Sequence, residues 1–186
     1  MNATDFVLFL IDGVSGQVEG RSLLQRRAYF VSVLAGIDSD LGFVTHYNGP
    51  YSFFVDNSLT RLKSLGLLNQ SGIEPPVRSS RFEIKLYQYR LTNQGVKAVA
   101  AAKQTQEYRA VAKACKAVRK AGNPDALILS IAAKTYFTLK KRAHGLSPSD
   151  IAREARSYNS TIKKTTLDAA VRFLGELKLG QRSNPN

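Results

Sequence analysis

Residues 43–68 read FVTHYNGPYSFFVDNSLTRLKSLGLL, and the fold depends on this stretch. Glycine and proline interrupt regular structure, so Asn48-Gly49-Pro50 is expected to end a short strand over Phe43–Tyr47 and to lead into a new element. Ser52 is a favourable N-cap for that element, and Asp56 falls in its first turn, where a carboxylate complements the helix dipole. The stretch therefore predicts a strand, a tight turn and a helix that begins at Ser52.

The predicted helix, residues 52–65, has two different faces. Its apolar row recurs at helical spacing, must be buried, and consists of Val55, Leu59, Leu62 and Leu65. The opposite, polar and basic face carries Asn57, Thr60, Arg61, Lys63 and Ser64. Gly66 is expected to end the helix as a left-handed C-cap, before a strand that starts at Leu67-Leu68. A strand, a polar-basic helix and a second strand are typical of a winged helix-turn-helix. An ordinary amphipathic helix in a mixed domain is the alternative.

A two-stranded ribbon is predicted after this helix. Leu67–Gln70 and Arg81–Leu91 are extended runs, and the segment between them, Ser71–Ser80, contains Gly72 and Pro75-Pro76. Prolines are excluded from regular strand interiors, so this segment is expected to form the tip. The apolar alternation of the second run shifts by one residue after its midpoint, which indicates a bulge or a strand that leaves the core. A ribbon in this position is the wing of a winged helix.

Two helices are predicted on the N-terminal side of the central stretch. Thr4-Asp5 is expected to cap the first, Asp5–Ile11, and Val14–Gly20 is interpreted as a loop. Ser22 and Gln25 have the spacing of a capping box, which predicts that the second helix begins there. Gly36 is expected to end it, and Arg26 and Arg27 to lie at the margin of its apolar face.

A long alanine-rich helix is predicted from Gln94 to Ala121, capped by Leu91-Thr92-Asn93. Residues Lys103–Gln106 interrupt its apolar row, which indicates a bend or an exposed turn. Four cations at positions i, i+4, i+7 and i+11 form one basic stripe, which consists of Arg109, Lys113, Lys116 and Lys120. Gly122-Asn123-Pro124 is expected to end the helix and to mark a domain boundary.

Three further helices are predicted in the last third of the chain, over Asp125–Arg142, Ser147–Ser157 and Thr161–Leu179. In the second of them Ser147 is a cap and Pro148 occupies the first helical position. A short helix, a tight connection and a longer helix repeat the helix-turn-helix pattern. The last helix offers a further set of polar and basic side chains, namely Lys163, Lys164, Thr165 and Arg172.

Charge is distributed unevenly along the 186 residues. The formal net charge is +13, of which residues 1–92 contribute +1 and residues 93–186 contribute +12. Such an excess favours a polyanionic partner, most simply nucleic acid. A single cysteine, Cys115, fits a reducing compartment. Without a signal-peptide pattern or an apolar run long enough to cross a membrane, a soluble cytoplasmic or nucleoid-associated protein is expected.

The residue pattern gives little support for an enzymatic activity. The two histidines, His46 and His144, lie far apart in the sequence, and His46 is expected to have a structural role beside the Gly-Pro turn. Cys115 lies on the apolar row of the long helix and is expected in the core. No spacing of His, Cys, Asp and Glu resembles a metal site, and the Gly13–Gly16 segment lacks the lysine of a P-loop. We therefore expect no enzyme activity, no metal and no cofactor.

Two groups of residues carry a resemblance to a known family. They are Gly20, Arg21, Leu24 and Gln25 in the second helix, and Tyr47, Gly49, Pro50, Tyr51 and Ser52 in the turn, followed by Leu62 and Leu65-Gly66-Leu67. Over about residues 1–100 the chain resembles the YwgA family of predicted winged-helix transcriptional regulators. It is more distantly similar to the Panacea antitoxin domain, which neutralises toxins. The resemblance implies a winged-helix fold and, with it, DNA binding. Two departures are Arg27, in place of an apolar residue, and the length of the segment Ile37–Tyr51.

The sequence thus predicts a mostly α, α+β protein with three parts. These are a winged helix-turn-helix domain over residues 1–92, a long basic connecting helix over 93–122 and a three-helix, helix-turn-helix-like domain over 123–186. The predicted function is that of a DNA-binding regulator that contacts duplex DNA mainly through phosphates. The alternatives are an antitoxin-like or adaptor module with a protein-binding groove near Tyr47–Ser52, and an RNA-binding protein. Homodimer formation is left open.

Overall fold

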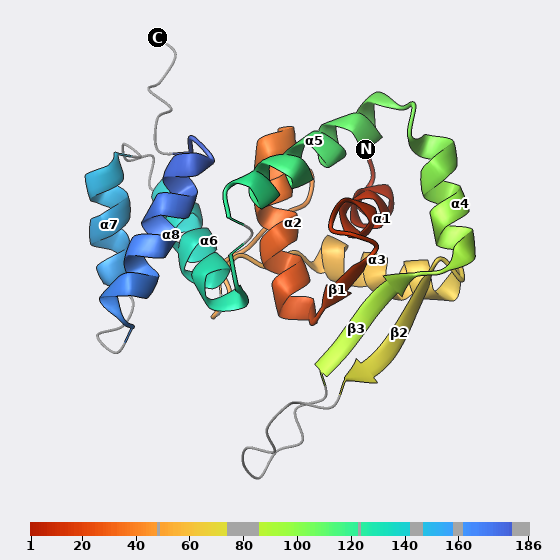
Figure 1. Ribbon diagram of the computed structural model, residues 1–186, viewed down its shortest axis with the longest axis horizontal. Coiled ribbons are helices and arrows are strands. Elements are labelled where there is room, and N and C mark those ends of the chain that lie inside the picture. The colour runs from red at the N-terminus through yellow and green to blue at the C-terminus, as the bar shows by residue number, and fades with distance from the viewer. Residues whose placement is uncertain (48, 74–85, 123, 142–146, 158–161, 180–186) are drawn as a thin grey trace. The chain divides into compact units, whose positions relative to one another are not determined.

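The computed structural model describes residues 1–47, 49–73, 86–122, 124–141, 147–157 and 162–179, and the structural statements below concern these residues. They form eight helices and one three-stranded antiparallel sheet (Figure 1). The expectation of a mostly helical α+β protein is therefore confirmed. The chain divides into two compact units, residues 1–43 with 52–116 (unit 1) and residues 44–51 with 117–186 (unit 2). This division differs from the predicted one, because most of the basic region 93–122 belongs to unit 1.

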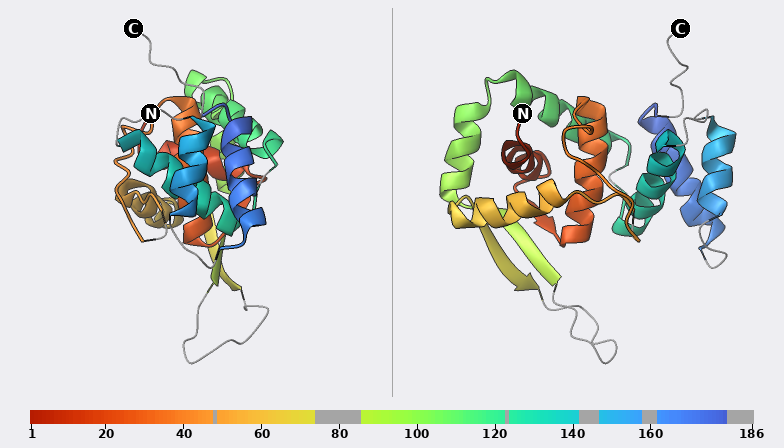
Figure 2. Two further views of the ribbon diagram at one scale, coloured as in Figure 1. Left: turned by 90° about the vertical axis from the view of Figure 1, so that its left-hand side faces the viewer. Right: turned by 180° about the vertical axis from the view of Figure 1, so that it is seen from behind.

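Helix α1, Ala3–Gly13, is the centre of unit 1. Every residue from Phe6 to Ile11 is buried, because α1 packs against α2, α3 and α4 and against the sheet. Figure 1 and the right-hand view of Figure 2 show α1 nearly end-on, with α2, α3, α4 and α5 around it. The cap predicted at Thr4-Asp5 is wrong by two residues, since the side chain of Asn2 accepts the bond from the Asp5 amide at 2.9 Å. Because it is apolar on every face over these six residues, α1 contributes more consecutive buried residues to the core of unit 1 than an amphipathic helix could.

The second helix begins differently from the prediction. Helix α2, Arg21–Ala35, has Gly20 as its N-cap with no side-chain bond, so the predicted capping box at Ser22 and Gln25 does not form. The segment predicted as a loop also contains a short strand, β1, Gln17–Glu19. Within β1 Val18 is paired with Tyr89 and buried. Three residues are too few to show the alternation that identifies a strand in a sequence.

The predicted third helix is confirmed. Helix α3 spans Phe53–Ser64, and the Ser52 hydroxyl accepts a hydrogen bond from the Val55 amide at 3.1 Å. Gly66 follows with φ +70°, the left-handed conformation expected after the helix. The short strand predicted over Phe43–Tyr47 is wrong, since only the single bridge Val44↔Tyr51 forms there. Ser52 therefore caps α3 as expected, although the chain enters it from a loop.

The predicted ribbon forms over its described part. Strands β2, Leu68–Ile73, and β3, Leu86–Leu91, pair in antiparallel register with Leu68 opposite Leu91. Strand β1 pairs with the other edge of β3, which gives the order β1-β3-β2. Strand β2 continues through residues 71–73, so the predicted start of the tip at Ser71 is wrong by three residues; the rest of the tip and residues 81–85 of the predicted second run lie outside the described residues. Tyr89 is fully buried in the middle strand, so β3 attaches the ribbon to the core.

The single long helix predicted over 94–121 is wrong, because two helices occupy that segment. Helix α4, Asn93–Ala102, is capped by the Thr92 hydroxyl, which accepts from the Gly95 amide at 3.0 Å. Helix α5, Gln106–Lys120, starts afresh after Thr105, whose hydroxyl accepts from the Tyr108 amide at 3.2 Å. A hydroxyl that caps a following turn competes with helix continuation. The interruption predicted at 103–106 is thus a complete helix end.

Unit 2 contains three helices that pack against one another: α6, Ala126–Lys141, α7, Pro148–Arg156, and α8, Lys164–Glu176. Ser147 caps α7 as predicted, with its hydroxyl accepting from the Asp150 amide at 3.1 Å. Helix α8 is shorter than the predicted 161–179, since Lys163 is its N-cap. The core of unit 2 consists of apolar side chains from all three helices, among them Leu129, Tyr136, Ile151, Leu167 and Leu174.

Gly49 is expected to be required by its backbone conformation. Its φ is +114°, and a Cβ at this position would lie 3.6 Å from the Ser130 carbonyl oxygen of α6. The Gly49→Val variant should therefore lose about 1–3 kcal/mol of unfolding free energy in unit 2. Urea denaturation of the full chain measures the loss. Gly175→Val, where the backbone has an ordinary φ and a Cβ meets nothing within 4 Å, is the control. Equal stability of both variants would contradict the requirement.

Candidate nucleic-acid interface

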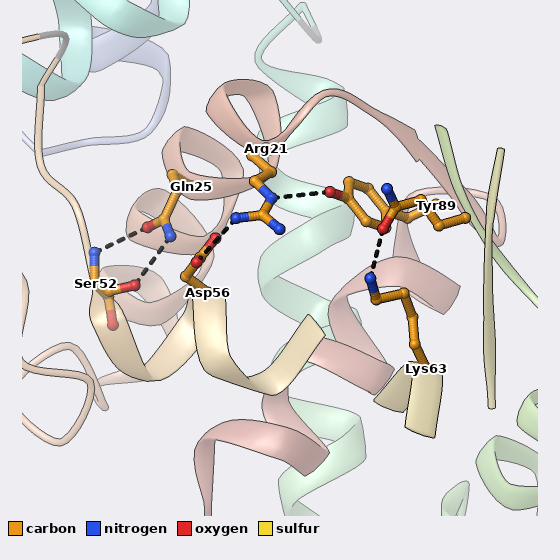
Figure 3. Close-up of polar contacts among 7 residues, drawn as sticks. Arg21, Gln25, Ser52, Asp56, Lys63 and Tyr89 are labelled. Atoms are coloured by element: carbon orange, nitrogen blue, oxygen red, sulfur yellow. Dashed lines mark hydrogen bonds and ion pairs between the residues drawn. The ribbon is translucent and has the colours of Figure 1, made fainter. Parts of the chain in front are cut away.

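The start of α3 is held by a buried pair of hydrogen bonds from α2. The Gln25 side chain donates from Nε2 to the Ser52 carbonyl at 2.9 Å and accepts at Oε1 from the Ser52 amide, also at 2.9 Å (Figure 3). The Ser52 hydroxyl donates to the Leu41 carbonyl. Gln25 and Ser52 are both buried, so these groups have no access to water. We call this paired contact the Gln25–Ser52 clasp. It satisfies the buried Ser52 amide and gives the Ser52 carbonyl a second donor beside the Asp56 amide, which donates to it at 3.1 Å.

Arg21 joins three elements of unit 1. Its Nη1 lies 3.1 Å from Oδ2 of Asp56 on α3, and its Nε donates to the Tyr89 hydroxyl of β3 at 3.1 Å (Figure 3). Asp56 was predicted to complement the dipole of α3, and it also forms an ion pair with Arg21. Three of the residues that carry the family resemblance, Arg21, Gln25 and Ser52, hold α3 in place relative to α2 and the sheet.

The polar face of α3 is available for contacts at three of its four predicted positions. Asn57, Thr60 and Arg61 are exposed, and their side chains make no hydrogen bond or ion pair with another described residue. Lys63 is half-buried, and its ammonium group donates to Gln70 of β2 at 2.6 Å (Figure 3). Lys63 is therefore engaged at the base of the ribbon, whereas Arg61 is free to contact a ligand.

Apolar side chains also reach the surface of α3. Phe53, Phe54 and Leu65 are each more than half exposed, so the burial predicted for Leu65 is wrong. Phe54 and Leu65 line a cavity of about 470 Å³ together with Asn57, Arg61 and the first turns of α1. The exposed side of α3 is therefore more apolar than the sequence pattern indicated.

The basic stripe predicted on the long helix lies on α5 alone. Arg109, Lys113, Lys116 and Lys120 are all exposed, and the opposite row is buried, namely Val111, Ala114, Cys115 and Val118. Arg109 donates to Gln104 at 2.5 Å. The side chains of the three lysines make no ion pair with another residue in the described ranges. The first three stripe residues belong to unit 1, and Lys120 lies in the last turn of α5, assigned to unit 2. Cys115 is in the core, as expected.

Two further arginines are placed differently from the prediction. Arg26 is buried rather than at the margin of α2, and Arg27 is half-buried. Desolvation by burial lowers the pKa of both, and for Arg27 this is opposed by the neighbouring Cys115 and Glu19. Arginine keeps its proton in proteins even so. Both cations belong to the interior of unit 1 and add nothing to its exposed basic surface.

The start of α8 is the third predicted surface. Lys163 is the N-cap, makes no side-chain cap bond, and is exposed together with Lys164 and Thr165. Arg172, two turns later, is exposed as well, and none of these side chains has a partner among the described residues. Cations at the positive end of a helix dipole are unfavourable unless an anion neutralises them. No acidic residue occupies the first turn of α8.

Of the residues considered for catalysis, Cys115 is buried and His144 lies outside the described residues. His46 is exposed, with its ring 5.2 Å from that of Tyr51. On α5 the Tyr108 hydroxyl donates to Asp12 at 2.7 Å. Desolvation by burial, and to a smaller extent this hydrogen bond, raises the pKa of Tyr108 to about 12. Within the described ranges no cluster of three or more His, Cys, Asp or Glu side chains is arranged to hold a metal ion.

The stretch Tyr47–Ser52, predicted as the edge of a protein-binding groove, is largely turned inward. Gly49, Pro50 and Ser52 are buried, and Tyr47 is exposed. No helix among the described residues is long and apolar enough to cross a lipid bilayer. In comparisons with known proteins, the chain matches no family model and no curated protein.

Proposed function

We propose that the protein binds duplex DNA as a winged-helix regulator of the kind that the YwgA family represents. The order α1-β1-α2-α3-β2-β3 and the sheet order β1-β3-β2 support this proposal. In this proposal α3 is the recognition helix and the β2–β3 ribbon is the wing. The proposal likewise treats α7 and α8 of unit 2 as a second helix-turn-helix.

The observation that carries the proposal is the set of exposed cations without a partner. Lys113, Lys116, Lys120, Lys163, Lys164 and Arg172 make no ion pair with another described residue. Rows of like charge on one helix repel one another, which destabilises the free protein. A polyanion removes this repulsion and releases counterions as it binds. Duplex DNA supplies phosphates in a regular row, which suits a row of lysines on α5.

The surfaces are assigned different roles. Lysine contacts to phosphate position a protein on DNA and carry no base information, so α5 supplies affinity. Asparagine and arginine can each form paired hydrogen bonds with a base edge, the former with adenine and the latter with guanine. Asn57 and Arg61 on α3 are therefore assigned to sequence preference. Lys163, Lys164 and Thr165 at the start of α8 are assigned to a second contact, because recognition helices contact DNA through their N-terminal residues.

Selection of bound fragments from random duplex DNA tests the proposal directly. A consensus should emerge, and the affinity for it should fall linearly with salt on logarithmic axes. Single-stranded RNA of the same length, added as a competitor, distinguishes DNA binding from the RNA-binding alternative. Absence of duplex binding at low salt would overturn the proposal.

Arg61 and Lys63 provide a matched pair for base recognition. Arg61→Gln should flatten the salt dependence by at most about one unit and cost about 1–3 kcal/mol of discrimination at one base position. Lys63→Gln should leave discrimination unchanged, because its ammonium group is engaged with Gln70. Fluorescence anisotropy with the selected site and a scrambled site measures both. Wild-type discrimination in Arg61→Gln would mean that Arg61 does not read a base.

A protein-binding role is the second candidate, and one observation favours it. Phe54, Leu65 and Arg61 line the cavity of about 470 Å³ between α1 and α3. Aromatic side chains and arginine are enriched at the centres of protein interfaces. Competition between duplex DNA and a captured protein partner would separate the two roles.

A further inference from the structure

The loop 44–51 is a closed and anchored element of unit 2. Its base is closed by two backbone hydrogen bonds, from the Val44 amide to the Tyr51 carbonyl at 2.9 Å and from the Tyr51 amide to the Val44 carbonyl at 3.0 Å. Gly49 and Pro50 are buried, and the backbone at Gly49 lies against α6 near Ser130. The loop therefore has an inner side that packs on α6 and an outer side that faces solvent.

The outer side presents a tyrosine to solvent. Thr45, His46 and Tyr47 are exposed, and Tyr47 is 89% exposed. Its side chain makes no hydrogen bond or ring contact with another described residue. A tyrosine ring normally buries 150–250 Å² of surface when it packs, about as much as any side chain can contribute. Because the loop is anchored and the Tyr47 ring is exposed to solvent, the ring offers a flat surface on which a base can stack.

Positive charge lies against the same loop, at Thr45, two residues before Tyr47. Lys141, in the last turn of α6, donates to the Thr45 hydroxyl at 3.4 Å, and its ammonium group lies 4.8 Å from the centre of the Phe137 ring. Lys140 is exposed next to it. Residues 44–51 contain no charged side chain, and unit 2 as a whole carries 13 Lys and Arg against 5 Asp and Glu. A loop that carries an exposed aromatic ring and is contacted by a lysine matches the chemistry of a nucleotide, whose base stacks and whose phosphate is anionic.

We propose that the loop 44–51 and the end of α6 bind an unpaired base of a nucleic acid. Tyr47 stacks on the base, and Lys141 contacts the phosphate next to it. This inference rests on the proposed function in one respect, namely that the partner is a nucleic acid. It does not depend on the duplex contacts, which are assigned to other surfaces. The site would let the protein hold a single-stranded segment or a base displaced from a duplex.

The chain contains no tryptophan, so Tyr47→Trp introduces a unique fluorophore at the loop. The tryptophan emission should decrease to a plateau as a twelve-nucleotide thymidine strand is added. It should not change when a blunt duplex is added. Val96→Trp is the control, because Val96 is also exposed, at 53%, but lies on α4 in unit 1, outside the proposed nucleic-acid surfaces. Its emission should not change with the same strand.

Binding measurements on the chain without an introduced tryptophan complete the test. Tyr47→Ala should weaken binding of a labelled thymidine strand about 5- to 100-fold, Tyr47→Phe should bind like wild type, and duplex affinity should be the same for all three. Single-strand affinity that survives in Tyr47→Ala, or emission of the Tyr47→Trp variant that only a duplex quenches, would overturn the inference and leave the proposed function standing. Failure of the wild-type chain to bind either form at low salt would overturn both.

Discussion

Changing Arg109, Lys113, Lys116 and Lys120 to glutamine should weaken binding to every duplex and flatten its salt dependence. Each lost phosphate contact removes about 0.9 from the slope of log K against log salt, so the slope should fall by up to about 4 units. The corresponding loss of affinity is about a thousandfold at about 0.1 M salt. The loss should be the same for selected and scrambled sites, because phosphate contacts carry no sequence information.

The geometry of α5 accounts for the size of this effect. The four charges span eleven residues of one continuous helix, which is about 16 Å at 1.5 Å per residue. One DNA strand presents about five phosphates over that axial length. All four charges of the stripe can therefore lie opposite phosphates of one DNA strand. Since its lysines have no intramolecular ion pair among the described residues, no internal salt bridge has to break first.

The control is a variant with the same change in charge at other exposed positions. Lys97, Lys103, Arg156 and Lys178 are exposed and lie outside the three proposed surfaces. Their replacement by glutamine should alter the slope by much less than the stripe variant, and circular dichroism should show both variants folded. Equal slopes for the wild type and the stripe variant would mean that α5 does not contact DNA. The protein-binding role would then become the leading candidate.

The sequence predicted local features well. Helix α3, its Ser52 cap and the glycine after it depend on residues within one or two turns of each other, and all three are confirmed. The exposed positions of the α5 stripe followed from helical spacing alone. Helix periodicity and capping are properties of neighbouring residues, so a single sequence contains them.

The features that the sequence did not predict depend on contacts between distant residues. Gln25 has the spacing of a capping residue, yet its partner, Ser52, lies 27 positions away. Lys63 was predicted on a free surface, and it is engaged because the turn after α3 brings Gln70 beside it. Strand β1 forms because β3 pairs with it from 73 positions away at Gln17 and Arg90. Such pairings are set by the tertiary fold, which propensity alone does not contain.

The Gln25–Ser52 clasp is expected to have the largest effect on stability of any single side chain in the interface. The Gln25→Met variant keeps the volume of the side chain and removes both hydrogen bonds. It leaves the Ser52 amide buried without this partner, whereas the Ser52 carbonyl keeps the Asp56 amide as a donor, so the change should cost about 1–3 kcal/mol of unfolding free energy. Gln106→Met, at an exposed position, is the matched control and should change stability by less than about 0.5 kcal/mol.

The same variant tests whether the clasp orients α3 for recognition. Because the clasp fixes the residue that caps α3, its loss should let the helix change its angle to α2, while the α5 stripe stays intact. Under conditions where Gln25→Met remains folded, it should keep its non-specific affinity for duplex DNA and its salt slope, but discriminate less between selected and scrambled sites. Urea denaturation and fluorescence anisotropy provide the two measurements. Wild-type stability would show that water or another group replaces the glutamine. Lower stability with full discrimination would show that α3 is oriented by Arg21 and the apolar core rather than by the clasp.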